Sequence, residues 1–297
     1  SLTSRGEFYT AYTPYQPESS QGTLQSIYEY QSAIARLTGM PFANASLYDG
    51  ATAVFEAAAM AVRITGRRRI VVHQSVNPRW REVLVTHAEN LEVEIVDGKN
   101  PEGAACVIAQ NPSFRGTIRD FTALGESCHA QGALLVSIFY PISLGILKTP
   151  GEMGADIAIA EGQSLGMYLG FGGPYLGILA TRKEFVRKMG GRIARQTLDN
   201  QGRRGFVLTL QAREQHIRRE KAMSNICSNQ ALCALRALIY LSLMGKQGLR
   251  EVAEACHAKA EYLKNKLSFA SVLNGGPTFN EFAVRLPGGD DDKPVWL

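Results

Sequence analysis

Several segments that follow apolar runs of the chain carry residue types that bind ligands. Segment 49–53 (DGATA) begins an alanine-rich stretch, and small residues at a helix N-terminus leave backbone N–H groups free to bind an anion. A phosphate site is one interpretation of this segment. A helix cap is the other, because Asp49 and Thr52 can accept hydrogen bonds from free amides, and Asp49 puts negative charge where a phosphate would lie.

Two later loops are candidates for contact with a ligand. The turn Gln110-Asn111-Pro112 can hold a side chain over a ring-shaped ligand, or it is simply a turn. Segment 163–174 (QSLGMYLGFGGP) holds four glycines, which let the backbone come close to something large. The segment therefore contacts a ligand or another subunit, unless it is a flexible surface loop.

The N-terminal segment 9–18 (YTAYTPYQPE) contains three Tyr and two Pro and continues to Gln21-Gly22. Tyrosine offers rigid contact area with a polar tip. This segment is either part of a site or an arm that packs on the domain or on a partner.

Basic side chains gather in segment 203–225, which carries six Lys and Arg against two Glu. The segment meets an acidic partner or a phosphate, or else it is a solvated helix with i,i+4 ion pairs. The run Arg67-Arg68-Arg69 follows a predicted helix end, where positive charge complements the helix dipole.

Several classes of protein are disfavoured by the overall pattern. Five Cys without a CxxC pair and five His without partners by spacing predict no metal site and reduced thiols, as in the cytoplasm. The net charge of +5 is too small and scattered to indicate nucleic-acid binding. No apolar run approaches the ~18 residues of a membrane helix, and no signal peptide is visible. The chain begins without Met and ends soon after a strand, so we expect both ends to be incomplete.

The 297 residues, of which 45% are hydrophobic, suffice for a large buried core. Short apolar runs alternate with helical patterns, which predicts an α/β fold with a mainly parallel sheet and helices on both faces. The predicted strands are 70–73, 91–96, 105–109, 133–139, 155–160, 176–180 and 279–286. The predicted helices are 23–38, 51–65, 78–89, 119–131, 182–190, 209–220, 229–244 and 247–268.

Four long strings resemble glycine decarboxylase, the P-protein of the glycine cleavage system. They are 9–22, 37–58, 154–182 and 202–232, and the resemblance covers nearly the whole chain. The last two look like the N-terminal half in organisms that split the enzyme into two chains. The resemblance implies the type I fold of pyridoxal-phosphate enzymes. It also implies an arm at 1–22, a large α/β domain at 23–245, and a linking helix with the start of a small C-terminal α/β domain at 246–297.

The family reaction needs a lysine joined to pyridoxal phosphate and an aspartate on the pyridine nitrogen. By the resemblance, the lysine position falls on Gln163 or Ser164, and the aspartate position holds Tyr140. Neither an amide nor a hydroxyl forms a Schiff base, and the ten lysines include no good substitute. We therefore expect that this chain does not bind the cofactor covalently.

The resemblance implies that a sister subunit 2 (beta) carries the lysine and the pyridoxal phosphate. The pair would decarboxylate glycine and pass the aminomethyl group to the lipoyl arm of the H-protein. By the resemblance, four residues of this chain line the entrance to that site, and two reach the partner's cofactor phosphate. The first set is Tyr12, Tyr15, Gln16 and Glu18, and the second is Ser224 and Asn225.

Two other functions remain to be compared with this one. In the first, the chain is an architectural partner that only stabilises the active subunit. In the second, it is a self-sufficient aminotransferase or decarboxylase, which the missing lysine disfavours. We expect neither nucleic acid nor membrane among its partners.

Overall fold

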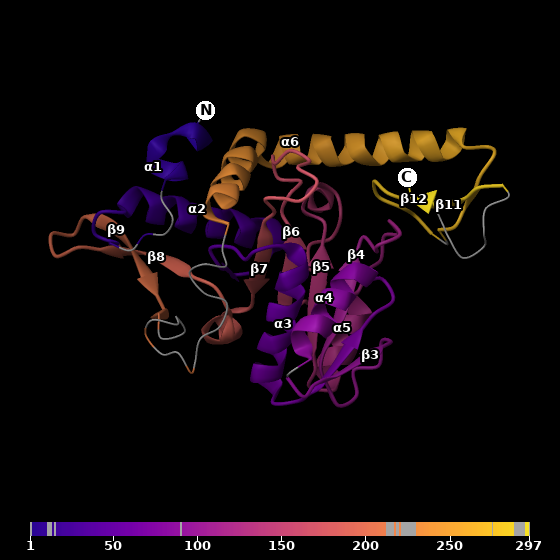
Figure 1. The fold of residues 1–297 in the computed structure, drawn as a ribbon, viewed down its shortest axis with the longest axis horizontal. Helices are drawn as coiled ribbons and strands as arrows, with labels where there is room; N and C mark the ends of the chain where they lie inside the picture. Colours follow the sequence, from indigo (N-terminus) through magenta and orange to yellow (C-terminus); the bar gives the residue numbers. More distant parts are fainter. Residues whose placement is uncertain are drawn as a thin grey trace.

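The computed structural model describes residues 2–10, 14, 16–89, 91–211, 217, 220, 230–274, 276–287 and 295–296. Its centre is a seven-stranded sheet of order β1-β7-β6-β5-β4-β2-β3 (Figure 1). Strands β2 to β6 run parallel, and β7 is antiparallel to both β6 and β1. The strands are β1 Phe42–Ala43, β2 Arg69–Val72, β3 Glu94–Asp97, β4 Ala104–Asn111, β5 Leu134–Phe139, β6 Ile157–Glu161 and β7 Gly177–Thr181.

Helices cover both faces of this sheet, as predicted. Ile157 and Ile159 of β6 pack with residues of α3 and α4, whereas Ala158 and Ala160 pack with residues of α2 and α6. Because successive strand side chains point to opposite faces, an apolar strand without alternation is buried on both. The helices are η1 Leu2–Ser4, α1 Gly6–Tyr9, α2 Gln21–Thr38, α3 Gly50–Thr65, α4 Pro78–Ala88, α5 Thr122–Ala130, η2 Pro141–Gly145, η3 Lys183–Lys188 and α6 Ala231–Lys266.

Helix α6 links the large sheet to a small one. It lies across one end of the large sheet and reaches the strands β10 Ser271–Val272, β11 Ala283–Arg285 and β12 Val295–Trp296 (Figure 1). Gly245, with a φ of 60°, interrupts α6 and separates the two predicted helices. The division of the chain at 1–22, 23–245 and 246–297 stays a prediction.

One predicted helix, and one of the two interpretations of the basic segment, differ from the structure. Segment 182–190 contains the 3-10 helix η3 instead of an α-helix. In the basic segment, Arg204–Thr209 forms strand β9, which pairs antiparallel with β8 Ile193–Leu198, so its described start is not a solvated helix. Pairing with β8 and burial of Phe206 beside Ile27 of α2 favour the strand. Most of 210–225 lies outside the described residues.

Among the described helices, none combines the length and the apolar character that a membrane crossing requires. Over the same residues, no group of three His, Cys, Asp or Glu could hold a metal ion.

Candidate functional site

The candidate site lies where three chain segments meet at the carboxyl ends of strands of the large sheet. These are the start of α3, residue Tyr140 after β5, and the loop after β6 that contains Gln163 and Ser164. In open α/β sheets, ligands bind beyond the carboxyl ends of the strands. Two of the candidate segments, 49–53 and 163–174, are therefore joined to each other and to Tyr140 in the fold.

The start of α3 is capped by its own side chains. Asp49 Oδ1 accepts a hydrogen bond from Thr52 N at 2.7 Å, and Thr52 Oγ1 accepts one from Asp49 N at 3.2 Å. This reciprocal pair is a capping box, which satisfies two of the free amides of a helix start. The structure therefore has the cap, one of the two interpretations of segment 49–53.

Glu161, which the sequence analysis did not single out, joins the segments of the site. Its Oε2 accepts from Gly50 N at 3.0 Å, and its Oε1 accepts from Gln163 N and Leu176 N, each at 2.9 Å. Burial raises the pKa of this carboxyl to about 7, although the three amides lower it. The carboxylate thus takes the anion position at the start of α3.

The space in front of α3 is filled by side chains. A Cβ at Gly50 would lie 2.5 Å from Cη2 of Trp80 and 2.9 Å from Cβ of Glu161. Glycine is required here because the Trp80 ring and Glu161 approach the backbone directly. The only sequence signal for Glu161 is that a charged residue ends the apolar strand β6.

The loop after β6 holds no amine. Gln163 Nε2 donates to Met167 O at 3.1 Å, and Ser164 Oγ is buried. The Ser164 hydroxyl lies near Tyr140, whose pKa it lowers, whereas burial raises the pKa of Tyr140 more strongly. The structure thus brings together the three residues that the resemblance assigned to the lysine and aspartate positions.

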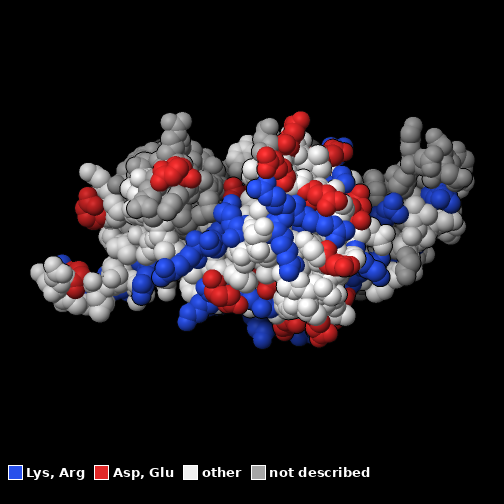
Figure 2. Space-filling model, turned by 90° about the horizontal axis from the view of Figure 1, so that it is seen from below, with Lys and Arg blue, Asp and Glu red and all other residues white. Residues whose placement is uncertain are grey.

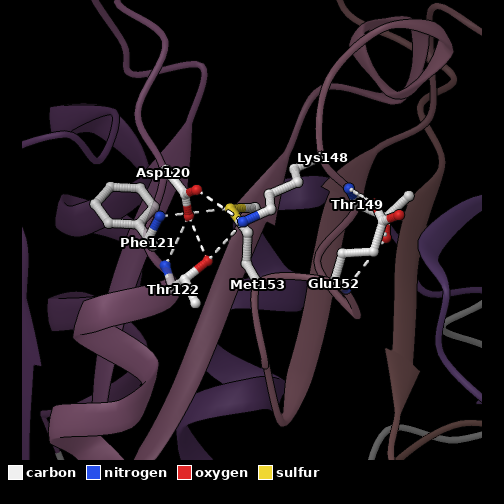
Figure 3. Close-up of polar contacts among 7 residues, drawn as sticks. All are labelled: Asp120, Phe121, Thr122, Lys148, Thr149, Glu152 and Met153. Carbon is white, nitrogen blue, oxygen red and sulfur yellow. Dashed lines mark hydrogen bonds and ion pairs between the residues drawn. The ribbon is translucent and has the colours of Figure 1, made fainter.

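Lys148 is engaged at the surface. Its Nζ forms an ion pair with Asp120 Oδ2 at 2.8 Å and a hydrogen bond with Thr122 Oγ1 at 3.1 Å (Figure 3). The bond from Lys148, together with the side-chain and backbone bonds from Thr122, lowers the pKa of Asp120 to about 2. Lys148 therefore contributes to the start of α5.

The turn Gln110-Asn111-Pro112 uses its polar atoms within the fold. Gln110 Oε1 accepts from Asn77 N at 2.9 Å, and Asn111 Oδ1 accepts from Arg119 N at 2.8 Å. These side chains fix the loops that follow β2 and β4.

The glycine-rich segment 163–174 exposes large apolar side chains. Phe171 is 95% exposed, Leu169 73% and Tyr168 67%. Gly166 and Tyr168 also line a cavity of about 370 Å³ with Leu2 and Thr3 of the N-terminus. The segment therefore packs against its own chain on one side and presents an apolar surface on the other, as a partner contact would need.

The N-terminal residues of the predicted entrance are only partly described. Gln16 and Glu18 are exposed in a turn in which Gln16 O accepts from Ser19 N and Ser20 N, both at 3.0 Å. Among the described residues, no hydrogen bond or ion pair joins them to Gln163. Tyr12, Tyr15, Ser224 and Asn225 lie outside the described residues.

The basic run after α3 serves the fold. Arg67 donates to the carbonyl of Gln131 at 2.8 Å, at the end of α5 instead of α3, and Arg68 pairs with Glu92 at 2.7 Å. Figure 2 shows a band of Lys and Arg on the face seen from below, with Asp and Glu alongside.

Comparison with known proteins gives a consistent result. The family described as glycine cleavage system P-protein matches residues 1–292. A probable glycine dehydrogenase (decarboxylating) subunit 1 of Geotalea daltonii is 56% identical over 303 residues, which cover 96% of this chain and 69% of the relative. The protein of the same name from Thermomicrobium roseum is 54% identical, with 95% and 67% covered.

The solved structures extend this comparison to the fold. A crystal structure of glycine decarboxylase (P-protein) of the glycine cleavage system, in inhibitor-bound form, matches with a TM-score of 0.92 and 48% identity, covering 96% of this chain and 68% of that one. An aspartate aminotransferase from Thermus thermophilus matches at a TM-score of 0.63 and 16% identity, covering 96% and 81%. The chain thus has the type I fold of pyridoxal-phosphate enzymes.

Pyridoxal phosphate, the cofactor that this fold implies, does not fit the described residues as a covalently held group. The loop after β6 offers Gln163 and Ser164 instead of an amine. At the start of α3, Glu161 already accepts from Gly50 N, so this amide is not free for a phosphate, and the Asp49 carboxylate at the same helix start would repel one.

Proposed function

Because this chain belongs to the glycine cleavage system P-protein family, we propose that it is subunit 1 of a two-chain glycine dehydrogenase (decarboxylating). In this proposal, a sister subunit 2 carries the reactive lysine and holds pyridoxal phosphate. The pair decarboxylates glycine and transfers the aminomethyl group to the lipoyl arm of the H-protein.

One observation carries the assignment of the cofactor to the sister subunit. The places where this chain would hold the cofactor are occupied by the chain's own groups. Glu161 links Gly50 N to Gln163 N, and Tyr140 follows the last residue of the neighbouring strand β5. A subunit whose own site is closed in this way contributes to the reaction only through another chain.

This chain's residues are proposed to complete the partner's site. Tyr12, Tyr15, Gln16 and Glu18 line the entrance used by glycine and by the lipoyl arm, and Ser224 and Asn225 contact the partner's cofactor phosphate. The exposure of Gln16 and Glu18 supports this role, because neither side chain is consumed by the core of its own chain.

The exposed apolar side chains of the loop after β6 support a contact with the sister subunit. Tyr168, Leu169 and Phe171 lie on one glycine-rich segment beside the candidate site. Large aromatic side chains are the ones that anchor protein–protein interfaces. The four described cysteines are free, and we propose that the pair works in the cytoplasm, where thiols stay reduced.

Reconstitution tests the proposal. Release of labelled CO₂ from glycine, with lipoylated H-protein present, is measured for this chain, for the sister subunit and for the mixture. Only the mixture is expected to be active. In the mixture, the Tyr15→Phe and Glu18→Gln variants should assemble normally and lose roughly tenfold or more of kcat/KM.

A matched variant and the architectural alternative complete the test. Glu89→Gln, an exposed glutamate at the end of α4, should leave turnover unchanged. Unchanged turnover in Tyr15→Phe and Glu18→Gln would remove both residues from the site. A sister subunit as active alone as in the mixture would leave this chain only the architectural role, which the comparisons do not favour.

A further inference from the structure

A polar cavity of about 440 Å³ lies at the loops that follow β2 and β4. It is enclosed by the loop after β2, by the loop after β4 and by Leu273 and Asn274, which precede β11. Its volume is in the range of small-molecule sites. None of the Glu161 contacts Gly50, Gln163 and Leu176 is among the residues that line the cavity.

The cavity is held in shape by contacts between its walls. Asn274 Nδ2 donates to Thr117 Oγ1 at 2.9 Å, and Phe279 N donates to Gly116 O at 3.1 Å. A Cβ at Gly116 would lie 1.8 Å from the carbonyl oxygen of Glu281, so the two walls approach closely. The cavity is therefore part of the packed structure.

Two guanidinium groups stand at the rim of the cavity without an ion pair. Arg115 and Arg119 both line it and are exposed. Among the described residues, no carboxylate lies within ion-pair distance of either group. The nearest acidic residue in sequence, Asp120, pairs with Lys148.

The hydroxyl groups of the cavity have protons left to donate. Ser113 Oγ accepts from Thr117 N at 3.1 Å, and Thr117 Oγ1 accepts from Asn274. In each case the bond uses one lone pair of the hydroxyl oxygen, and the O–H donates to no acceptor among the described residues. The Ser75 hydroxyl instead donates within the fold. Ser75 N donates to His73 Nδ1 at 3.1 Å, so this nitrogen is an acceptor, and the Ser75 hydroxyl lies 2.8 Å from it.

The charge of Arg119 also acts on His73, whose Nδ1 lies 2.8 Å from the hydroxyl of the cavity residue Ser75. The pKa of His73 is lowered by burial and then by the charges of Arg119 and Lys99. His73 accepts at Nδ1 and is therefore neutral there, and it adds no charge that would oppose an anion.

We propose that this cavity binds a small oxyanion, the phosphate or carboxylate group of a small molecule. Arg115 and Arg119 pair with the oxygens, and the hydroxyls of Ser113 and Thr117 donate to them. Guanidinium groups pair with carboxylate and phosphate oxygens through two parallel hydrogen bonds, which gives both affinity and orientation.

Calorimetric titration of the full chain tests the proposal. Inorganic phosphate and acetate are titrated separately at low, constant ionic strength, because salt screens exposed charges. We expect saturable one-site binding of at least one of them. Phosphate binding alone identifies a phosphate ligand, and acetate binding alone identifies a carboxylate ligand.

Variants assign the binding to the cavity. Arg119→Gln and Arg115→Gln should each weaken binding roughly tenfold or more, since each removes a charge-assisted contact. Arg187→Gln, an exposed arginine of η3 outside the cavity, should leave it unchanged. Absence of saturable binding of both anions, or equal affinity in Arg119→Gln and the unchanged chain, overturns the proposal. Circular dichroism confirms that each variant is folded.

Discussion

Replacement of Glu161 by glutamine tests the carboxylate that closes the candidate site. Glutamine has the same shape and keeps one oxygen acceptor, which can serve Gln163 N and Leu176 N. Its amide NH₂ would face Gly50 N–H, which now donates to Oε2 at 3.0 Å. A buried donor left without an acceptor costs about 1–3 kcal/mol, so Glu161→Gln should be destabilised by that amount at acidic pH.

The pH dependence of this variant gives a sharper result. The pKa of Glu161 is about 7 in the folded chain, against 4.5 for an ordinary glutamate, so between these values the folded state binds more protons than the unfolded state. The stability of the unchanged chain should therefore fall as pH rises through this window. The difference in pKa corresponds to roughly 3 kcal/mol at most.

Urea unfolding from about pH 5 to about pH 8 measures both effects. Glu161→Gln lacks this titration, so its deficit relative to the unchanged chain should shrink as pH rises. Glu82→Gln, an exposed glutamate of α4, serves as the control and should follow the unchanged chain. Parallel pH profiles for Glu161→Gln and the unchanged chain would refute the reasoning.

Other perturbations probe the cap, the cavity wall and the partner surface. Asp49→Ala removes the acceptor of Thr52 N and should lower the free energy of unfolding by about 0.5–2 kcal/mol, measured by urea unfolding. Gly116→Ala should displace the carbonyl of Glu281, because the φ of Gly116 is +83° and the new Cβ would lie 1.8 Å from that carbonyl oxygen. An unchanged midpoint of urea unfolding would contradict this. Phe171→Ala should weaken assembly with the sister subunit roughly tenfold or more by calorimetry, with the fold intact, and equal affinity would exclude Phe171 from the interface.

The fold was largely predictable from the sequence because its strands are buried on both faces. The runs at β4 and β5 are apolar without alternation. Helix α2 ends at Gly39 and helix α3 at Gly66, each glycine in a left-handed conformation. The β8–β9 hairpin was not predicted because the basic residues at the start of β9 resemble a solvated helix. The strand conformation of β9 depends on pairing with β8 and on packing of Phe206, neither of which is a local property of the sequence.

The loops of the candidate site were predictable from the sequence, but the hydrogen bonds that join them were not. Gln163, Ser164 and Tyr140 were placed by resemblance, and the structure brings them together. Glu161 was missed because its partner Gly50 lies 111 residues away, and only the folded chain shows that this carboxylate takes the helix amide. Tyr12, Tyr15, Ser224 and Asn225 remain predictions.

The central claim is that the cofactor is joined to the sister subunit. The reconstituted pair, loaded with pyridoxal phosphate, is reduced with borohydride, and each chain is digested and analysed by mass spectrometry. We expect a reduced lysyl adduct on the sister subunit and none on this chain. An adduct on any of this chain's ten lysines would contradict it.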